Sequence, residues 1–307
     1  MCNTAHMHDP ETSPTGRPDP TEPPSARAGI VAALAGFILQ QLVIALAWNV
    51  FPAGLCLAFG AVLGVCVPLA VWCRRARISL RAWVRLRRLE PRELVTVLGF
   101  SIALLAPAYA VNARWQQFVP PGDGVLDFYA ALIPTSPMTL LVGALGVIVL
   151  GPMAEEWVFR GLLQPALGRR LPAPAAILTV AVLFAAAHAS LAFFPALLIL
   201  GLGLGCVAWW TGSTHASWLL HAAANAVAYV DLWKTHTPET PELDRWSLQA
   251  PVLAGSVLVL GAAGWILSTS QRTSSPGAAR EFAPAPDPGQ PSLSVESKTG
   301  NSKDGEA

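Results

Sequence analysis

Two adjacent carboxylates, Glu155 and Glu156, are followed by Arg160 in an otherwise apolar stretch of the sequence. A charge at mid-bilayer costs on the order of 3 kcal/mol on insertion scales, so such residues usually face the bundle interior and have partners. Glu156 and Arg160 are four residues apart, so on a helix they share a face and can form an ion pair. Glu155 is rotated by about 100° and has no cation on its own face. Glu155 is therefore the candidate for catalysis, and Glu156 and Arg160 are candidates for structural support.

Two later clusters carry imidazoles in apolar surroundings. FAAAHAS puts Phe184 and His188 on one helical face, and SWLLHAAANA does the same for His221 and Asn225. Together with Glu155 these side chains could hold and activate water. Glu155, His188 and His221 are of the ligand types that zinc accepts. Without a metal, Glu155 and His188 could deprotonate water while His221 and Asn225 donate hydrogen bonds to an oxyanion.

The three clusters together resemble the CAAX protease and bacteriocin-processing family, also called the Abi family of intramembrane proteases. The family pattern is E-E-x-x-x-R, then F-x-x-x-H, then H-x-x-x-N, and all three occur here in order over about residues 138–232. The resemblance implies an α-helical intramembrane endopeptidase. By analogy its catalytic residues would be Glu155, His188, His221 and Asn225, and Glu156, Arg160 and Phe184 would support the site.

The resemblance also implies the partners and leaves the cofactor open. The substrate would be a peptide or protein, with prenylated proteins and bacteriocin precursors as candidates. Zinc or another divalent metal would be held by Glu155, His188 and His221, but a metal-free, glutamate-based mechanism is also argued for the family. Both mechanisms are retained as hypotheses.

The composition predicts a multi-pass protein of the cell membrane. Hydrophobic residues make up 53% of the sequence and charged residues only 13%, about half the charge of a soluble domain. The expected fold is an all-α bundle of about eight spans within residues 28–270. The predicted spans are 28–50, 51–72, 93–111, 138–167, 174–191, 193–210, 218–232 and 251–267.

The arginines predict the orientation of the bundle. The loop between the second and third spans contains RRARISLRAWVRLRRLEPR, whereas the loop after the third span carries only Arg114. The positive-inside rule therefore places both termini in the cytoplasm. Residues 81–90 are read either as an interfacial helix or as a plain loop. Residues 1–27 and 271–307 are expected to be disordered tails because they are rich in Pro, Ser and charged residues.

The three clusters lie at different predicted depths. On straight helices Glu155 and His188 would each lie about 21 Å from the cytoplasmic end of their spans. His221 would lie only about eight residues from Ser213. We therefore expect Pro152 and residues 211–217 to bend or re-enter, so that the clusters meet.

Three functions compete for these features. The main hypothesis is an endopeptidase that cuts near the inner leaflet of the membrane. A non-catalytic immunity or scaffold protein would keep the fold without the chemistry, and a proton-coupled transporter could also use buried Glu, His and Arg. Nucleic-acid binding is not expected, because topology explains the basic loop.

Overall fold

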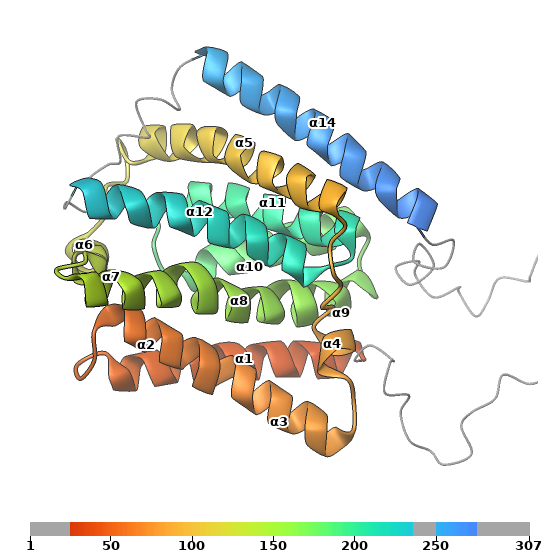
Figure 1. Cartoon of the computed structure of the whole chain (residues 1–307), viewed down its shortest axis with the longest axis horizontal. Coiled ribbons are helices and arrows are strands. Elements are labelled where there is room, and N and C mark those ends of the chain that lie inside the picture. The colour runs from red at the N-terminus through yellow and green to blue at the C-terminus, as the bar shows by residue number, and fades with distance from the viewer. Residues whose placement is uncertain (1–24, 236–249, 275–307) are drawn as a thin grey trace, which may run out of the picture.

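The chain forms a bundle of long helices, shown in a computed structural model that describes residues 25–235 and 250–274 (Figure 1). Within these ranges there is no strand, which agrees with the all-α prediction. Both predicted tails lie outside the described residues, except for their innermost positions, and so does much of the loop that follows residue 235. His236 also lies outside the described residues.

Each of the eight predicted apolar segments lies largely within helix, and some helices contain π-helical segments, which are labelled η. In chain order the helical elements are α1 (Ala26–Ala47), α2 (Ala53–Phe59), η1 (Gly60–Cys66), α3 (Val67–Ala76), α4 (Leu80–Trp83), α5 (Pro91–Trp115), α6 (Asp123–Leu132), α7 (Pro137–Ala144), η2 (Leu145–Leu150), α8 (Gly151–Glu156), η3 (Trp157–Leu163), α9 (Gln164–Gly168), α10 (Ala173–Ala187), α11 (Phe194–Thr211), α12 (Thr214–Thr235) and α14 (Ala250–Ser274).

Six of these helical stretches are long and apolar enough to cross a membrane. They show a multi-pass membrane protein, but they do not confirm a count of eight spans. Of the two remaining segments, α10 has only 15 residues. The other, α12, has 22 residues but is not among the six, and it carries the polar residues of the third motif. The cytoplasmic position of the termini stays a prediction.

The helix around Pro152 is continuous from residue 137 to residue 168 rather than broken. Proline lacks the N–H that an α-helix needs at an interior position. Here the chain passes Pro152 with the wider turns of η2 before it and η3 after it. The Gly151 N–H bonds to the carbonyl of Gly146, five residues earlier. π-helical turns, and not a break, are therefore the local answer to the proline.

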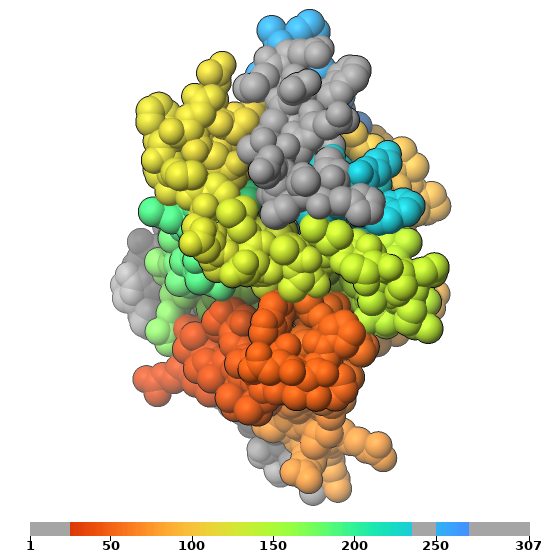
Figure 2. Space-filling view, turned by 90° about the vertical axis from the view of Figure 1, so that its left-hand side faces the viewer, coloured from red at the N-terminus to blue at the C-terminus, as the bar shows by residue number. Residues whose placement is uncertain are grey.

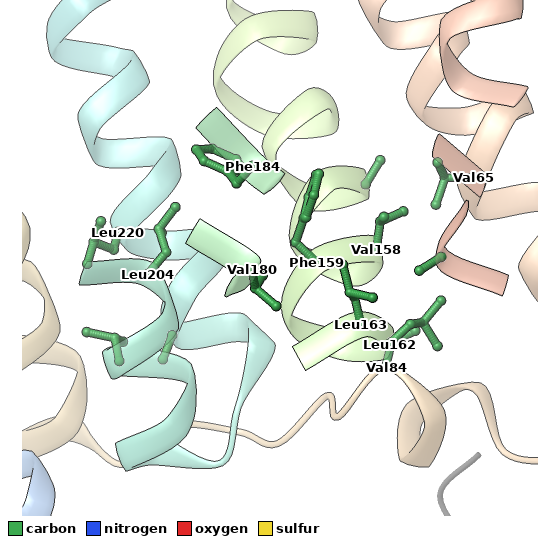
Figure 3. Close-up of a cluster of buried hydrophobic side chains, with 14 of the residues drawn as sticks. Val65, Val84, Val158, Phe159, Leu162, Leu163, Val180, Phe184, Leu204 and Leu220 are labelled. Atoms are coloured by element: carbon green, nitrogen blue, oxygen red, sulfur yellow. The ribbon is translucent and has the colours of Figure 1, made fainter. Parts of the chain in front are cut away.

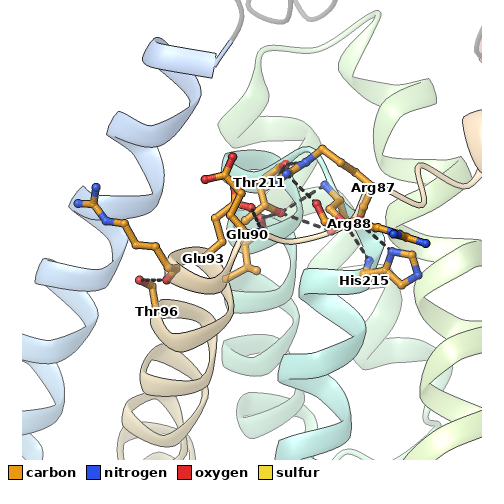
Figure 4. Close-up of polar contacts among 10 residues, drawn as sticks. Arg87, Arg88, Glu90, Glu93, Thr96, Thr211 and His215 are labelled. Atoms are coloured by element: carbon orange, nitrogen blue, oxygen red, sulfur yellow. Dashed lines mark hydrogen bonds and ion pairs between the residues drawn. The ribbon is translucent and has the colours of Figure 1, made fainter.

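The turn between α11 and α12 lies deep in the molecule, against the loop that follows α4. Gly212 adopts a positive φ of 62°, which ends α11. The Thr214 hydroxyl donates to the carbonyl of Val84 over 2.6 Å. Arg87 donates to the Thr211 carbonyl and to Glu93, and His215 bonds to the Arg87 carbonyl (Figure 4).

The start of this loop is buried because it packs on the helix that carries the two carboxylates. Val84 is fully buried, and a Cβ added to Gly161 would lie 3.0 Å from the Val84 Cα. The turn before α12 therefore starts at the level of Gly161, six residues after Glu155, and not at the end of α9. His221 is seven residues after Thr214. The side chains of Glu155 and His221 therefore reach the same depth without re-entry of residues 211–217.

The helices around the motifs share one apolar core (Figure 3). Its fully or almost fully buried members include Val84, Val158, Leu162, Val180, Phe184, Leu204 and Leu220. Of the two readings of residues 81–90, the structure has a single helical turn, α4, which begins after the cap of Ser79 and is followed by a loop. Val84 at the start of that loop is buried, whereas Arg87, Arg88 and Glu90 are exposed.

Candidate active site

Glu156 is at the centre of a sealed polar network. Its Oε1 accepts a hydrogen bond from Arg160 Nη1 over 2.9 Å and another from His221 Nδ1 over 3.0 Å. All three residues are at most 2% exposed. Arg160 also donates to the Gly201 carbonyl of α11 over 3.1 Å. The pair expected from the four-residue spacing is therefore present, and it is shared with an imidazole from α12.

Glu155 points in a different direction, as the rotation of about 100° per residue requires. Its side chain is 24% exposed, and its Oε2 lies 3.9 Å from His221 Nε2. Because the Glu156 carboxylate occupies Nδ1, the imidazole stands between the two carboxylates and directs Nε2 to Glu155. A water about 2.8 Å from both Oε2 and Nε2 would fit that separation.

His188 ends α10 and faces the same region from another side. Its Nδ1 lies 2.8 Å from the Phe184 carbonyl. A carbonyl has no hydrogen, so Nδ1 must donate, and the neutral ring then presents the Nε2 lone pair elsewhere. His188 is exposed, in contrast to His221.

Phe184 is the contact that both histidines share. Its ring centroid lies 4.8 Å from that of His188 and 5.5 Å from that of His221, in edge-on arrangements. The Arg160 guanidinium carbon lies 4.4 Å from the same centroid, close enough for a cation–π contact. Phe184 is fully buried, so it forms an apolar support beneath the imidazoles.

Asn225 bonds to the carbonyl that Pro152 leaves without a partner. In the five-residue register of η2, the carbonyl of Val147 would accept from residue 152, which has no N–H. Asn225 Nδ2 donates to that carbonyl over 2.9 Å. One hydrogen of the amide is thus committed to structure, and the second stays available for a ligand.

One cavity of about 680 Å³ is lined by Glu155, His188, His221 and Asn225 together. These are the four residues that the sequence singled out for catalysis. The residues assigned to support, Glu156, Arg160 and Phe184, are absent from its lining. The geometry therefore divides the motif residues into a set that faces the cavity and a set that lies behind it.

Other cavity residues carry no signal in the sequence. Gln40 of α1 is 4% exposed, lines the cavity, and leaves its Oε1 without a hydrogen-bond partner. Tyr129 of α6 also lines it, and burial raises the pKa of Tyr129 to about 12, so its hydroxyl stays protonated. Neither residue lies near a motif in the sequence, and only the packing of α1 and α6 brings them here.

The donor set does not fit the three-ligand metal site that the sequence left open. In the described part of the chain, no group of three His, Cys, Asp or Glu side chains is placed to hold a metal ion. Glu155 and His221 approach as a pair, while His188 joins them only as another residue of the cavity wall.

Comparison with known proteins bears on the same residues. A family model described as type II CAAX prenyl endopeptidase Rce1-like matches residues 137–227. This segment of the chain is therefore similar to the CAAX protease family. The match contains all seven motif residues and nearly coincides with the core expected over 138–232. No curated protein and no solved structure matches the chain.

The match confirms the resemblance drawn from the three motifs. It supports a CAAX-type protease embedded in a membrane helical protein, with a peptide or protein as substrate.

Proposed function

We propose that this protein is an endopeptidase of the cell membrane that hydrolyses a peptide bond with a water activated by Glu155. The observation that supports it is the arrangement of the two carboxylates. Glu155 faces a cavity shared with His188, His221 and Asn225, whereas the adjacent Glu156 is sealed in the protein. A protein that used both carboxylates only for packing would have no need of this division.

The reaction follows from the hydrogen bonds. Glu155 accepts a proton from the water, which is also held by the lone pair of His221 Nε2. The resulting hydroxide oxygen attacks the carbonyl carbon, and the second N–H of Asn225 donates to the oxyanion. The C–N bond then breaks as Glu155 returns the proton to the leaving nitrogen. His188 Nε2 accepts a hydrogen bond from an N–H of the leaving amine.

Substrate binding would use the cavity walls. Apolar side chains of α1, α6 and α11 supply most of the surface, and Gln40 supplies a buried amide oxygen that lacks a partner. That oxygen can accept a backbone N–H of an extended peptide. Replacing Gln40 by Leu should therefore raise KM more than it lowers kcat.

The test compares two carboxamide variants in lipid nanodiscs. Wild type and Glu155→Gln are incubated with prenylated CAAX peptides and with bacteriocin-precursor peptides, and products are identified by mass spectrometry. Asp127→Asn is the control, because Asp127 is an exposed carboxylate of α6 outside the cavity lining. We expect cleavage by wild type and Asp127→Asn alone. Cleavage that survives Glu155→Gln would overturn the mechanism, and specific binding without any cleavage would favour the scaffold hypothesis.

A chelator separates the two forms of the mechanism. Since the described residues offer Glu155 and His221 as a pair and not a set of three ligands, we propose the metal-free form. Activity should persist after dialysis against EDTA, and the purified protein should contain far less than one zinc per chain by elemental analysis. Loss of activity with EDTA, restored by zinc, would require a metal ligand that this geometry does not provide.

A further inference from the structure

The catalytic cavity lies in one half of the helix bundle. Its lining comes from the second half of α1, from α6, from the turn between α10 and α11 with the first half of α11, and from α12 from His221 onward; Leu57 of α2 and residues of η2, α8 and η3 between Gly146 and Phe159 complete it. In the described part of the chain, none of it comes from the loop over 74–92 or from residues 168–172. Figure 1 shows α6 at one end of the bundle and α4 and α9 at the opposite end.

The cavity reaches the surface at the α6 end. Gly122 and Gly124 line it and are exposed, and so are His188 and Ala189 in the turn after α10. Figure 2 looks onto this end of the molecule, where the yellow and yellow-green segments, α6 among them, lie above the red and orange of α1 and α2. A peptide could enter here without passing through the packed core.

The opposite end is closed by side chains. Below Glu155 the bundle is filled by the Glu156–Arg160 pair and by Phe159, each at most 5% exposed. The next layer is apolar and fully or almost fully buried, and it includes Leu162, Leu204 and Val84 (Figure 3). This core separates the cavity from the end that carries α4 and α9.

The charges of the two ends are strongly unequal. The closed end carries a dense set of arginines, namely Arg27, Arg74, Arg75, Arg77, Arg81, Arg85, Arg87, Arg88, Arg92, Arg169 and Arg170. The open end carries Arg114 and Lys234 among the described residues, together with Asp123, Asp127 and Asp231. Basic residues near span ends are retained in the cytoplasm. The asymmetry therefore predicts that the closed end lies in the cytoplasm and the mouth of the cavity outside.

We propose that the cavity takes its substrate from the non-cytoplasmic side of the membrane. This inference rests on the proposed endopeptidase activity and specifies its substrate class. The substrate is an apolar peptide segment of an exported or membrane-inserted chain, at the level of the outer leaflet. A cytoplasmic prenylated C-terminus would meet the arginine-rich end, where the core is closed. The cut near the inner leaflet that the sequence suggested is replaced by one on the other side.

Cysteine labelling tests the orientation independently of activity. In a variant whose five native cysteines are replaced by serine or alanine, Gly124→Cys marks the mouth and Arg88→Cys marks the closed end. A side chain at Gly124 meets nothing within 4 Å, so it should be tolerated. We expect a membrane-impermeant maleimide to label Gly124→Cys in intact cells and Arg88→Cys only after lysis. The reverse pattern would overturn the inference while leaving the endopeptidase proposal intact.

A pair of reporters tests the substrate side. Each is a single-span membrane protein with a ten-residue segment of Leu, Ala, Val and Phe next to the bilayer, placed outside in one reporter and in the cytoplasm in the other. They are expressed with wild type or with Glu155→Gln. Cleavage of the outer reporter by wild type alone supports the inference. Cleavage of the inner reporter alone overturns it but keeps the endopeptidase. If neither reporter nor any peptide of the nanodisc panel is cut, the endopeptidase proposal itself fails.

Discussion

Replacing Glu155 or Glu156 by Gln should affect different properties of this protein: cleavage for Glu155 and stability for Glu156. Glu156→Gln removes the charge that holds two buried cationic or polar groups, whereas Glu155→Gln changes a side chain that is 24% exposed to the cavity. Glu156 receives hydrogen bonds of 2.9 Å from Arg160 and 3.0 Å from His221. In the Gln variant the two hydrogen bonds can keep their geometry, but the buried Arg160 stays charged and loses its ion-pair partner.

The expected size of the effect follows from that burial. Breaking a buried ion pair by neutralising one partner costs about 3–5 kcal/mol. For a protein of this size each kcal/mol lowers Tm by about 2–4 °C, so Glu156→Gln should lower Tm by about 6–20 °C. Glu155→Gln should change Tm by about 2 °C or less, because surface-accessible substitutions usually stay within about 0.5 kcal/mol.

The assay is thermal unfolding in one detergent, followed by size-exclusion chromatography of the soluble fraction and by peptide cleavage at 20 °C. Glu155→Gln should retain Tm and lose cleavage. The double variant Glu156→Gln/Arg160→Met should recover part of the lost Tm, since both buried charges are then absent. Equal Tm losses for the two single variants would show that the carboxylates are not divided between cavity and core. No recovery in the double variant would contradict the ion-pair argument.

Two further perturbations probe how the site is positioned. Gly161→Ala should lower stability by about 1–3 kcal/mol and reduce cleavage, because the new methyl must displace the Val84 backbone that sets the start of α12; an unchanged Tm would contradict this packing. Asn225→Ala should cost about 1–3 kcal/mol by leaving the Val147 carbonyl unpaired. Adding Pro152→Ala should restore stability, because the alanine supplies an N–H for the Val147 carbonyl. It should not restore activity if Asn225 also binds the oxyanion. A melting curve and a cleavage assay on one sample measure the two effects separately.

The sequence predicted which motif side chains lie together better than it predicted the contacts between them. The four-residue spacings placed Glu156 with Arg160 and Phe184 with His188, because helical periodicity acts within a single element. The bond between Glu156 and His221 joins residues 65 positions apart and depends on how α8 and α12 pack. No local pattern contains that information. His221 therefore has a more buried, more constrained place than the sequence suggested, and His188 a more exposed one.

The roles of Asn225 and Pro152 were also only partly predictable from the sequence. The proline suggested a kink, and the asparagine suggested an oxyanion donor. The structure joins them, because the amide meets the carbonyl that the proline leaves without a donor in a π-helical register. Whether a helix takes that register depends on the side chains packed around it, so neither residue reveals the contact alone.

Residues 81–90 explain why the motifs lie at one depth, although the predicted spans put them at different depths in the membrane. Residues 81–90 have the composition of a cytoplasmic loop, and their arginines are the strongest orientation signal in the chain. Yet Trp83 and Val84 are at most 6% exposed, and the backbone from Val84 to Arg87 accepts hydrogen bonds from residues 213–215. The loop thereby carries the start of α12 inward until His221 is level with Glu155. Orientation signal and active-site depth are thus set by one segment, which is possible because arginine side chains can extend to the surface while their backbone is buried.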